Sequence, residues 1–178
     1  MKINRFDEGL EHRNIVPYDP AYLDVFARVQ RYVQENLESV ELVHIGSTAI
    51  RGLRGKPMVD IAAITSQEDL RTVQEEFEKL GFHRRAVWVD KDEKPYVCGC
   101  IQHKGRRFNI NIHICHRGDP VHKDSLAFMD ILHRRPDLRR KYELAKDHAH
   151  MIDPVNPEVY NREKDAVIKE IHAQIGLA

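Results

Sequence analysis

The sequence lacks several features that define whole classes of protein. It has no apolar run long enough to cross a membrane, and its first residues lack the apolar core of a secretory signal peptide. No Gly-x-Ser-x-Gly segment is present, which excludes the nucleophile elbow of the α/β-hydrolases. Excess charge of either sign is also missing, because 28 Lys and Arg balance 28 Asp and Glu. We therefore expect a cytoplasmic protein with no membrane or nucleic-acid partner, in which any anion is bound by local charges.

Cysteine is scarce as well. Cys98, Cys100 and Cys115 are an odd number, and no two of them have the Cys-x-x-Cys spacing of redox and zinc motifs. Cys98 and Cys100 fall on one face of an expected strand and can meet Cys115 on a neighbouring strand. We interpret them as reduced thiols of the core, with a zinc site completed by a histidine as the alternative.

What is present is enough for one well-formed core. The chain has 178 residues, of which 42% are hydrophobic, and it contains no linker or internal repeat. We expect a single domain over residues 1–178, with a sheet core in residues 1–116 and C-terminal helices packed on it in residues 117–178.

The order of apolar patterns predicts a mixed α/β (α+β) domain. Three-residue and four-residue spacings indicate helices, whereas alternation and short apolar runs bounded by turns indicate strands. The central sheet should have about five strands, flanked by helices. Strands are expected at 41–45, 58–64, 82–89, 96–102 and 107–115, and helices after Asp19, after Ser66, over 121–134, from Pro136 and from Pro157.

The most informative segment is the loop from Gly46 to Lys56, between the first two expected strands. Gly46 permits a sharp turn and a close approach to a ligand, and the hydroxyls of Ser47 and Thr48 can donate to phosphate oxygens. Arg51, Arg54 and Lys56 add positive charge to the same loop. The loop is therefore predicted to bind an anion, and the alternative is a glycine turn with solvated charges.

Asp60 follows this loop, between Val59 and Ile61. A carboxylate among apolar neighbours requires a cation or a donor, and beside a phosphate loop it suits a magnesium-bound nucleotide. If the three strands concerned are neighbours, His44 and His113 can converge on Asp60 and help to bind a metal. The alternative is a hydrogen-bonded His–Asp pair that orients the loop.

Two further lysines lie near the C-terminus. Lys146 and Lys164 each follow a tyrosine by four residues, Tyr142 and Tyr160, so each pair shares one helix face. Such pairs can form the wall of a pocket that closes over a phosphate and a base. In the alternative, the tyrosine lies in the core and the lysine extends over it to solvent.

The order of residues from His44 to Ile61 resembles a known family. Gly46-Ser47 followed by Asp60-Ile61 is similar to the opening signature of the nucleotidyltransferase fold. More closely, His44-Ile-Gly-Ser-Thr-Ala, Lys56-Pro57 and Val59-Asp60-Ile61 resemble the GrpB family, which occurs alone and fused to dephospho-CoA kinase. The resemblance implies a nucleotidyltransferase-like fold. It also implies that Ser47, Arg54 and Lys56 grip phosphates, and that Asp60 is the catalytic residue and binds Mg or Mn, with His113 as a second ligand.

Two functions are consistent with this resemblance. Active nucleotidyltransferases place a second carboxylate two residues after the first, where this chain has Ala62, and a third on a later strand, where it has Asn111 and His113. The protein either transfers a nucleotidyl or phosphoryl group or is a non-catalytic module that binds a nucleotide, a CoA-type ligand or a CoA-pathway partner. The candidate substrate-binding residues are His44, Gly46, Ser47, Thr48, Arg54, Lys56, His113, Lys146, Tyr160 and Lys164.

Overall fold

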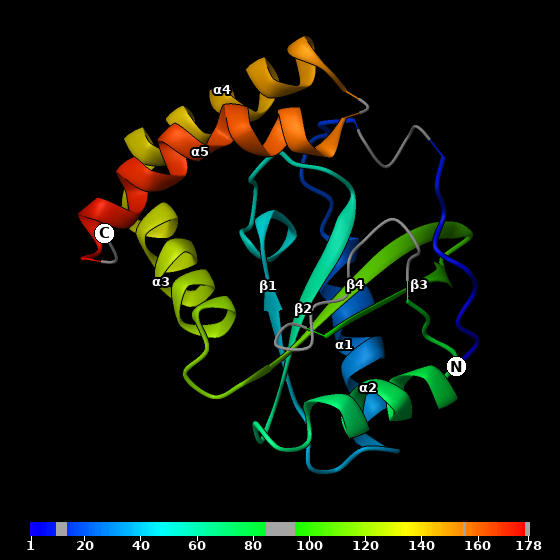
Figure 1. The fold of residues 1–178 in the computed structure, drawn as a ribbon. Coiled ribbons are helices and arrows are strands. Elements are labelled where there is room, and N and C mark those ends of the chain that lie inside the picture. Colours follow the sequence, from blue (N-terminus) through cyan, green and yellow to red (C-terminus); the bar gives the residue numbers. More distant parts are fainter. Residues whose placement is uncertain (10–13, 85–94, 155, 177–178) are drawn as a thin grey trace.

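The computed structural model describes residues 1–9, 14–84, 95–154 and 156–176 (Figure 1). Within these ranges the helices and strands follow the predicted order. The elements are α1 (Ala21–Gln34), β1 (Glu41–Ile45), a short 3-10 turn η2 (Ser47–Ala49), β2 (Met58–Thr65), α2 (Leu70–Lys79), β3 (Tyr96–His103), β4 (Arg106–His116), α3 (Pro120–Arg134), α4 (Pro136–Ile152) and α5 (Pro157–Gln174).

The four described strands form one mixed sheet in the order β1-β2-β4-β3. The central pair, β2 and β4, is parallel, and each outer strand is antiparallel to its neighbour. The predicted α/β (α+β) class with a mixed sheet is thus confirmed. Of the fifth expected strand, residues 85–89 lie outside the described residues, and His83 makes an isolated antiparallel bridge with Cys98.

One face of the sheet is covered by α1 and α2, and it contains the larger apolar core (Figure 1). Alternation along the strands sends the odd-numbered side chains of β2 and the even-numbered side chains of β4 to this face. Val59, Ile61, Ile110 and Ile112 are each fully buried there, and Phe77 of α2 packs in the same cluster.

The C-terminal helices lie on the other side. The first of them, α3, covers the end of the sheet where Ile45, Ala62, Ile64 and Cys115 form a small apolar cluster with partly buried Val121 and Met129. A second cluster joins α3, α4 and α5 to the glycine loop. Its buried members are Ile50, Leu53, Ile131, Leu132, Leu138, Tyr142 and Ile171.

The helix starts explain why the C-terminal predictions were accurate. Proline lies in the first turn of α3, α4 and α5, where a missing N–H is tolerated and the fixed φ suits a helix. Asp119 and Asn156 accept hydrogen bonds from the first backbone N–H groups of α3 and α5. None of the helices in the described ranges has the length and apolar character that crossing a bilayer requires.

Candidate functional site

Asp60 lies on the sheet face opposite the larger core. In the pairing of β2 with β4, Asp60 is opposite Asn111 and Ala62 is opposite His113. Paired residues project to the same side of a sheet, so Asp60, Asn111 and His113 share one face. Beyond them, at Ala62, the surface becomes apolar beneath α3. The polar part is therefore at the end of the central strands that adjoins the glycine loop.

A chain of hydrogen bonds fixes the carboxylate. The Tyr96 hydroxyl donates to Oδ1 of Asn111, and Nδ2 of Asn111 donates to Oδ1 of Asp60 over 2.9 Å. The ring of Tyr96 also packs against His113, with their centroids 5.4 Å apart. Three strands thus contribute to the environment of one aspartate.

Gly46 closes the site from the loop side. Its φ is 74°, which a glycine adopts without steric cost. A Cβ atom at this position would lie 2.8 Å from Oδ2 of Asp60. The glycine is therefore required both by the turn and by the approach of the loop to the carboxylate.

Two lysines meet at the ring of Tyr160. The Nζ atom of Lys56 lies 3.6 Å from the ring centroid, and that of Lys164 lies 4.4 Å from it. Tyr160 is 6% exposed, whereas both lysines are only partly buried. Both ammonium charges also act on Asp60 and oppose the rise in its pKa. The loop and α5 thus bring two positive charges to the end of the sheet where Asp60 lies.

A third lysine lies behind the loop. Lys146 of α4 is 1% exposed, and its Nζ donates to the backbone oxygen of Arg54 and lies 3.5 Å from Oγ of Ser47. The ammonium group lies 4.6 Å from the centroid of the Tyr142 ring. Lys146 therefore does not extend to solvent, as the alternative interpretation required. Its buried ammonium group contacts the loop at Ser47 and Arg54.

Burial shifts the protonation of the whole group. It raises the pKa of Asp60, against the opposing effects of His113, Asn111, Lys164 and Lys56, and it lowers the pKa of His113. Burial also lowers the pKa of Lys146 to about 7 and that of Lys164 to about 8, where Lys56 adds repulsion. These two amines therefore lose their proton at a pH much nearer to the physiological value than ordinary lysines do.

His44 does not join this group. It is paired with Ile61 and therefore points to the opposite face of the sheet from Asp60. Its ring stacks on Phe26 at 5.0 Å, and its Nε2 lies 3.0 Å from Oγ1 of Thr48. Burial lowers the pKa of His44 to about 4. The expected convergence of His44 with Asp60 and His113 is wrong, because residues 44 and 60 have opposite orientations in paired strands.

Two other loop residues have structural contacts. Thr48 is 3% exposed, and its hydroxyl donates to the backbone oxygen of Met58 over 2.9 Å. The side chain of Arg54 forms an ion pair with Asp147 at 2.8 Å, and its backbone N–H donates to Glu143. Both residues hold the loop in place, Thr48 through the start of β2 and Arg54 through α4. Among the described residues, no contact directs the side chain of Thr48 or of Arg54 toward Asp60.

A metal was expected at Asp60 and His113. Among the described residues, no group of three or more His, Cys, Asp or Glu side chains is arranged to hold a metal ion. The three cysteines are buried, free thiols, which agrees with their interpretation as core residues. The donor set beside Asp60 consists of one imidazole and one amide that donates to the carboxylate, so it does not fit a two-metal site.

Tyr96 was not singled out in the sequence. Its strand was predicted, but the hydrogen bond to Asn111 depends on the pairing of β3 with β4, which places residue 96 opposite residue 113. Alternation within residues 96–102 shows only that Tyr96 shares a face with Cys98 and Cys100. No local signal indicated that this face was the one carrying Asp60.

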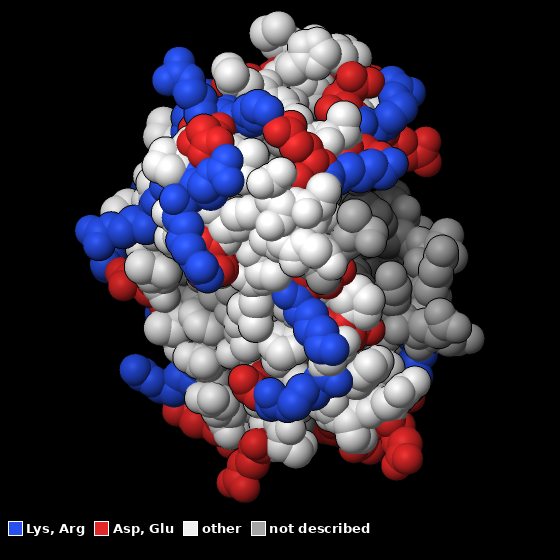
Figure 2. Space-filling view, turned by 90° about the vertical axis from the view of Figure 1, so that its left-hand side faces the viewer, with Lys and Arg blue, Asp and Glu red and all other residues white. Residues whose placement is uncertain are grey.

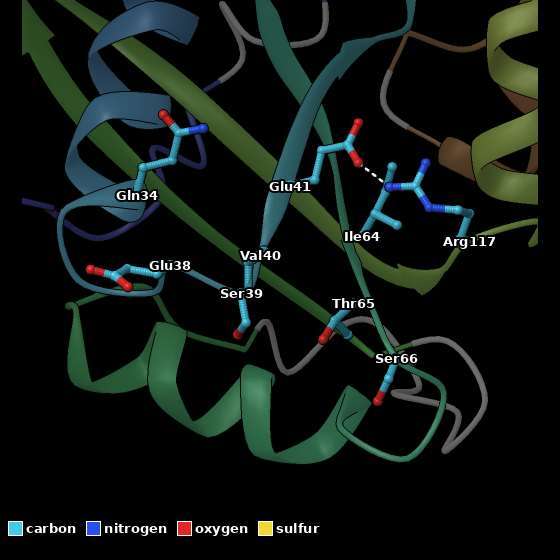
Figure 3. Close-up of a pocket in the computed structure, with 9 residues that line it drawn as sticks. All are labelled: Gln34, Glu38, Ser39, Val40, Glu41, Ile64, Thr65, Ser66 and Arg117. Atoms are coloured by element: carbon cyan, nitrogen blue, oxygen red, sulfur yellow. Dashed lines mark hydrogen bonds and ion pairs between the residues drawn. The ribbon is translucent and has the colours of Figure 1, made fainter.

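An open pocket of about 410 Å³ lies at the other end of the sheet (Figure 3). Residues at the start of β1 and at the end of β2 line this pocket. An ion pair between Glu41 and Arg117 lies across it. It contains none of the predicted site residues. The chemistry of the Asp60 cluster, rather than the volume of this pocket, therefore defines the candidate site.

The described residues on the side of the C-terminal helices present charges of both signs. Figure 2 shows acidic and basic side chains interspersed around an uncharged central area. This agrees with the equal numbers of acidic and basic residues in the sequence.

Comparison with known proteins gives a consistent result. Residues 13–174 match the family model described as GrpB protein. A UPF0157 protein of Halalkalibacterium halodurans is 26% identical over 160 residues, which are 88% of this chain and 79% of the relative. A UPF0157 protein of Streptomyces coelicolor is 30% identical over 167 residues, covering 90% and 83% of the two chains.

Solved structures extend the comparison to the fold. The conserved protein GrpB from Enterococcus faecalis has a TM-score of 0.72 at 24% identity, covering 91% of this chain and 96% of its own. The Cid1 poly(U) polymerase, in a structure described as MgGTP bound, has a TM-score of 0.54 at 13% identity, covering 84% and 44%. The fold is therefore nucleotidyltransferase-like, and this chain spans less than half of that polymerase.

Proposed function

The chain belongs to the GrpB family, and from this premise we propose that it binds a phosphorylated small molecule, with a nucleotide as the first candidate. The ligand would lie between the glycine loop, the Asp60 end of the sheet and α5. Its phosphate would meet Lys56 and Lys164, while the Ser47 hydroxyl would donate to one of its oxygens.

One observation carries this proposal. Lys56 and Lys164 come from elements more than a hundred residues apart, yet both lie against the ring of Tyr160 and both act on Asp60. Keeping two ammonium groups this close costs free energy through mutual repulsion, which already contributes to the lowered pKa of Lys164. An anion between them would relieve that repulsion.

The neighbouring folds make a nucleotide the first candidate. The polymerase structure is described as bound to MgGTP, and another neighbour is described as an RNA terminal U-transferase. These likenesses concern the fold alone, and the phosphate-directed lysines of this chain are the independent support. A CoA-type ligand offers the same phosphate chemistry and is the second candidate.

Binding without transfer is favoured over two-metal transfer. The position two residues after Asp60 is Ala62, which is fully buried in the apolar cluster with Ile45, Ile64 and Cys115. A carboxylate there would be desolvated under α3, so the site differs from a two-metal enzyme in packing as well as in residue type. Asp60 is then available to accept a proton or a hydrogen bond from the ligand.

Calorimetric titration with ATP, GTP and CoA tests the proposal. Wild-type protein should bind at least one of them, and Lys56→Ala and Lys164→Ala should each weaken binding by about tenfold or more, since a charged hydrogen bond contributes about 1.5–3 kcal/mol. Lys169→Ala is the matched control, because Lys169 lies on the same helix, is exposed and pairs with Asp165. Equal affinities in wild type and both site variants would refute the proposal.

A further inference from the structure

We propose that Tyr160 is a positioning residue of the phosphate site, because its ring holds Lys56 and Lys164 in place by cation–π contact and adds no negative charge to them. This role rests on the proposed function, in which the two ammonium groups bind the phosphate. The sequence predicted Tyr160 as a residue that binds the substrate itself. In the role proposed here, Tyr160 acts on the ligand through the two lysines.

The ring of Tyr160 is the point at which the glycine loop and α5 meet. Its centroid lies 3.6 Å from Nζ of Lys56 and 4.4 Å from Nζ of Lys164. Both distances are well inside the range of about 6 Å over which a ring attracts a cation. Lys164 follows Tyr160 by four residues and shares its helix face, whereas Lys56 comes from the loop. One buried ring therefore contacts both lysines of the proposed site.

The same helix shows the other way to hold a lysine. Lys169 follows Asp165 by four residues, and its Nζ lies 2.6 Å from the carboxylate. Lys164 has the same spacing from Tyr160, and no carboxylate of the described residues lies within ion-pair distance of its Nζ. A carboxylate compensates the charge of an ammonium group and competes with a phosphate for it. A neutral ring attracts the cation through its quadrupole alone, so Lys164 is held in place and can still bind an anion.

Burial keeps the ring of Tyr160 neutral. It raises the pKa of the Tyr160 hydroxyl above its usual value, and the charges of Tyr142 and Asp147 raise it further. The ordinary pKa of a tyrosine, about 10, already lies well above physiological pH. The hydroxyl therefore stays protonated, and no phenolate forms that would compensate a lysine as a carboxylate does.

The arrangement recurs on α4. Lys146 follows Tyr142 by four residues, and its Nζ lies 4.6 Å from the centroid of the Tyr142 ring. Lys146 is 1% exposed, and within the described ranges no carboxylate is at ion-pair distance from it. Its ammonium group donates to the backbone oxygen of Arg54 in the glycine loop. Both helices that adjoin the loop thus hold a lysine on a tyrosine ring, which supports cation–π contact as the means of placing cations in this region.

Calorimetric titration with pyrophosphate tests the role of the ring. Tyr160→Phe keeps the ring and should bind within about twofold of wild type. Tyr160→Leu removes it and should bind at least about fivefold more weakly, because two cation–π contacts are lost. Tyr22→Leu is the matched control. Tyr22 is 4% exposed and packs edge-on against Phe108 in the larger core, so this variant loses a buried ring elsewhere and should bind like wild type.

Fluorinated phenylalanines at position 160 separate the electrostatics of the ring from its packing. Added fluorines weaken the negative potential of the ring face and change its volume little. The affinity for pyrophosphate should fall stepwise along the series. The pKa of Lys164, measured without ligand by NMR of labelled lysine, should also fall, by about half a unit in total, because the ring favours the charged amine. Lys56 lowers this pKa and Asp60 raises it, and the series leaves both residues in place.

The outcomes distinguish this role from the proposed function. Pyrophosphate binding that is lost in Lys56→Ala and Lys164→Ala, but is unchanged by Tyr160→Leu and by fluorination, would overturn the role of the ring and leave the proposed function intact. A wild-type protein that binds no pyrophosphate would refute the proposed function and this role together. If Tyr160→Leu does not fold, Tyr160→Phe and the fluorinated series still decide, since a ring that only fills space gives the same affinity and the same Lys164 pKa throughout.

Discussion

At the scale of single residues, the site depends on how closely Gly46 and Asp60 approach each other. Sequence analysis identified both, because a glycine turn and a buried acid each have a local signature. It also grouped His44 with them, and this was wrong, because Asp60 is paired with Ile45, and the neighbouring residue His44 points to the opposite side of the sheet. Asn111 was recognised only as a replacement for an acid, and its role as a donor to Asp60 became visible from the strand pairing.

The substitution Gly46→Ala tests that approach. We expect a loss of about 3 kcal/mol in the free energy of unfolding, because the new Cβ combines a strained φ with a contact to Asp60. Gly105→Ala is the control, since its φ of 77° is similar and no atom of the described residues lies within 4 Å of the place that a Cβ would take. That variant should lose only about 1 kcal/mol. Urea denaturation measures both, and equal losses would show that the contact with Asp60 is unimportant.

The lysine at position 164 should make anion binding depend on pH. Burial and Lys56 lower its pKa to about 8, and a bound phosphate would raise it again. Between these two pKa values, binding takes up a proton, so affinity should fall as the pH rises above about 8, by up to about tenfold per pH unit. Lys164→Arg should bind with less dependence on pH, because arginine stays charged. Calorimetry in buffers of different ionisation enthalpy measures the proton uptake, and its absence in wild type would contradict this prediction.

At the scale of elements, the glycine loop has two sides with different tasks. Ile50 and Leu53 point into the cluster formed with α3, α4 and α5, whereas Lys56 lies against Tyr160. The sequence predicted the loop and the helices separately, because each has a local pattern. It did not indicate that the helices dock on the loop, since that contact joins residues far apart in the chain. The ion pair of Arg54 with Asp147 was not anticipated for the same reason.

Removing the apolar side of the loop should therefore loosen the helices. Leu53 is 1% exposed, and Leu53→Ala should cost about 3 kcal/mol of unfolding free energy and weaken ligand binding as well. Leu144→Ala is the control, because Leu144 is on α4 but 58% exposed, and it should change stability by less than about 0.5 kcal/mol. Chemical denaturation gives both values. A Leu53→Ala protein of wild-type stability would mean that the loop and the helices are energetically independent.

At the scale of the whole molecule, the sheet separates two apolar regions, and the candidate site lies where the loop joins them. The larger core beneath α1 and α2 holds the strands, and the cluster around Leu53 holds the C-terminal helices. A ligand at Lys56 and Lys164 would touch both parts, so binding should stabilise them together. At a ligand concentration about one hundred times the dissociation constant, this linkage amounts to about 2.7 kcal/mol.

The same arrangement predicts how the chain unfolds. The helices α3, α4 and α5 bury their apolar side chains against Ile50 and Leu53, which belong to the sheet part of the chain. Separating the two parts would expose this cluster to water and cost free energy. We expect one cooperative transition in differential scanning calorimetry, with equal calorimetric and van't Hoff enthalpies. Native-state hydrogen exchange should then give α5 and β2 similar opening free energies at their most protected amides. Two calorimetric transitions, or exchange through α3, α4 and α5 while the sheet stays protected, would show that the helices form a separate unit and that the site lies at a boundary able to open.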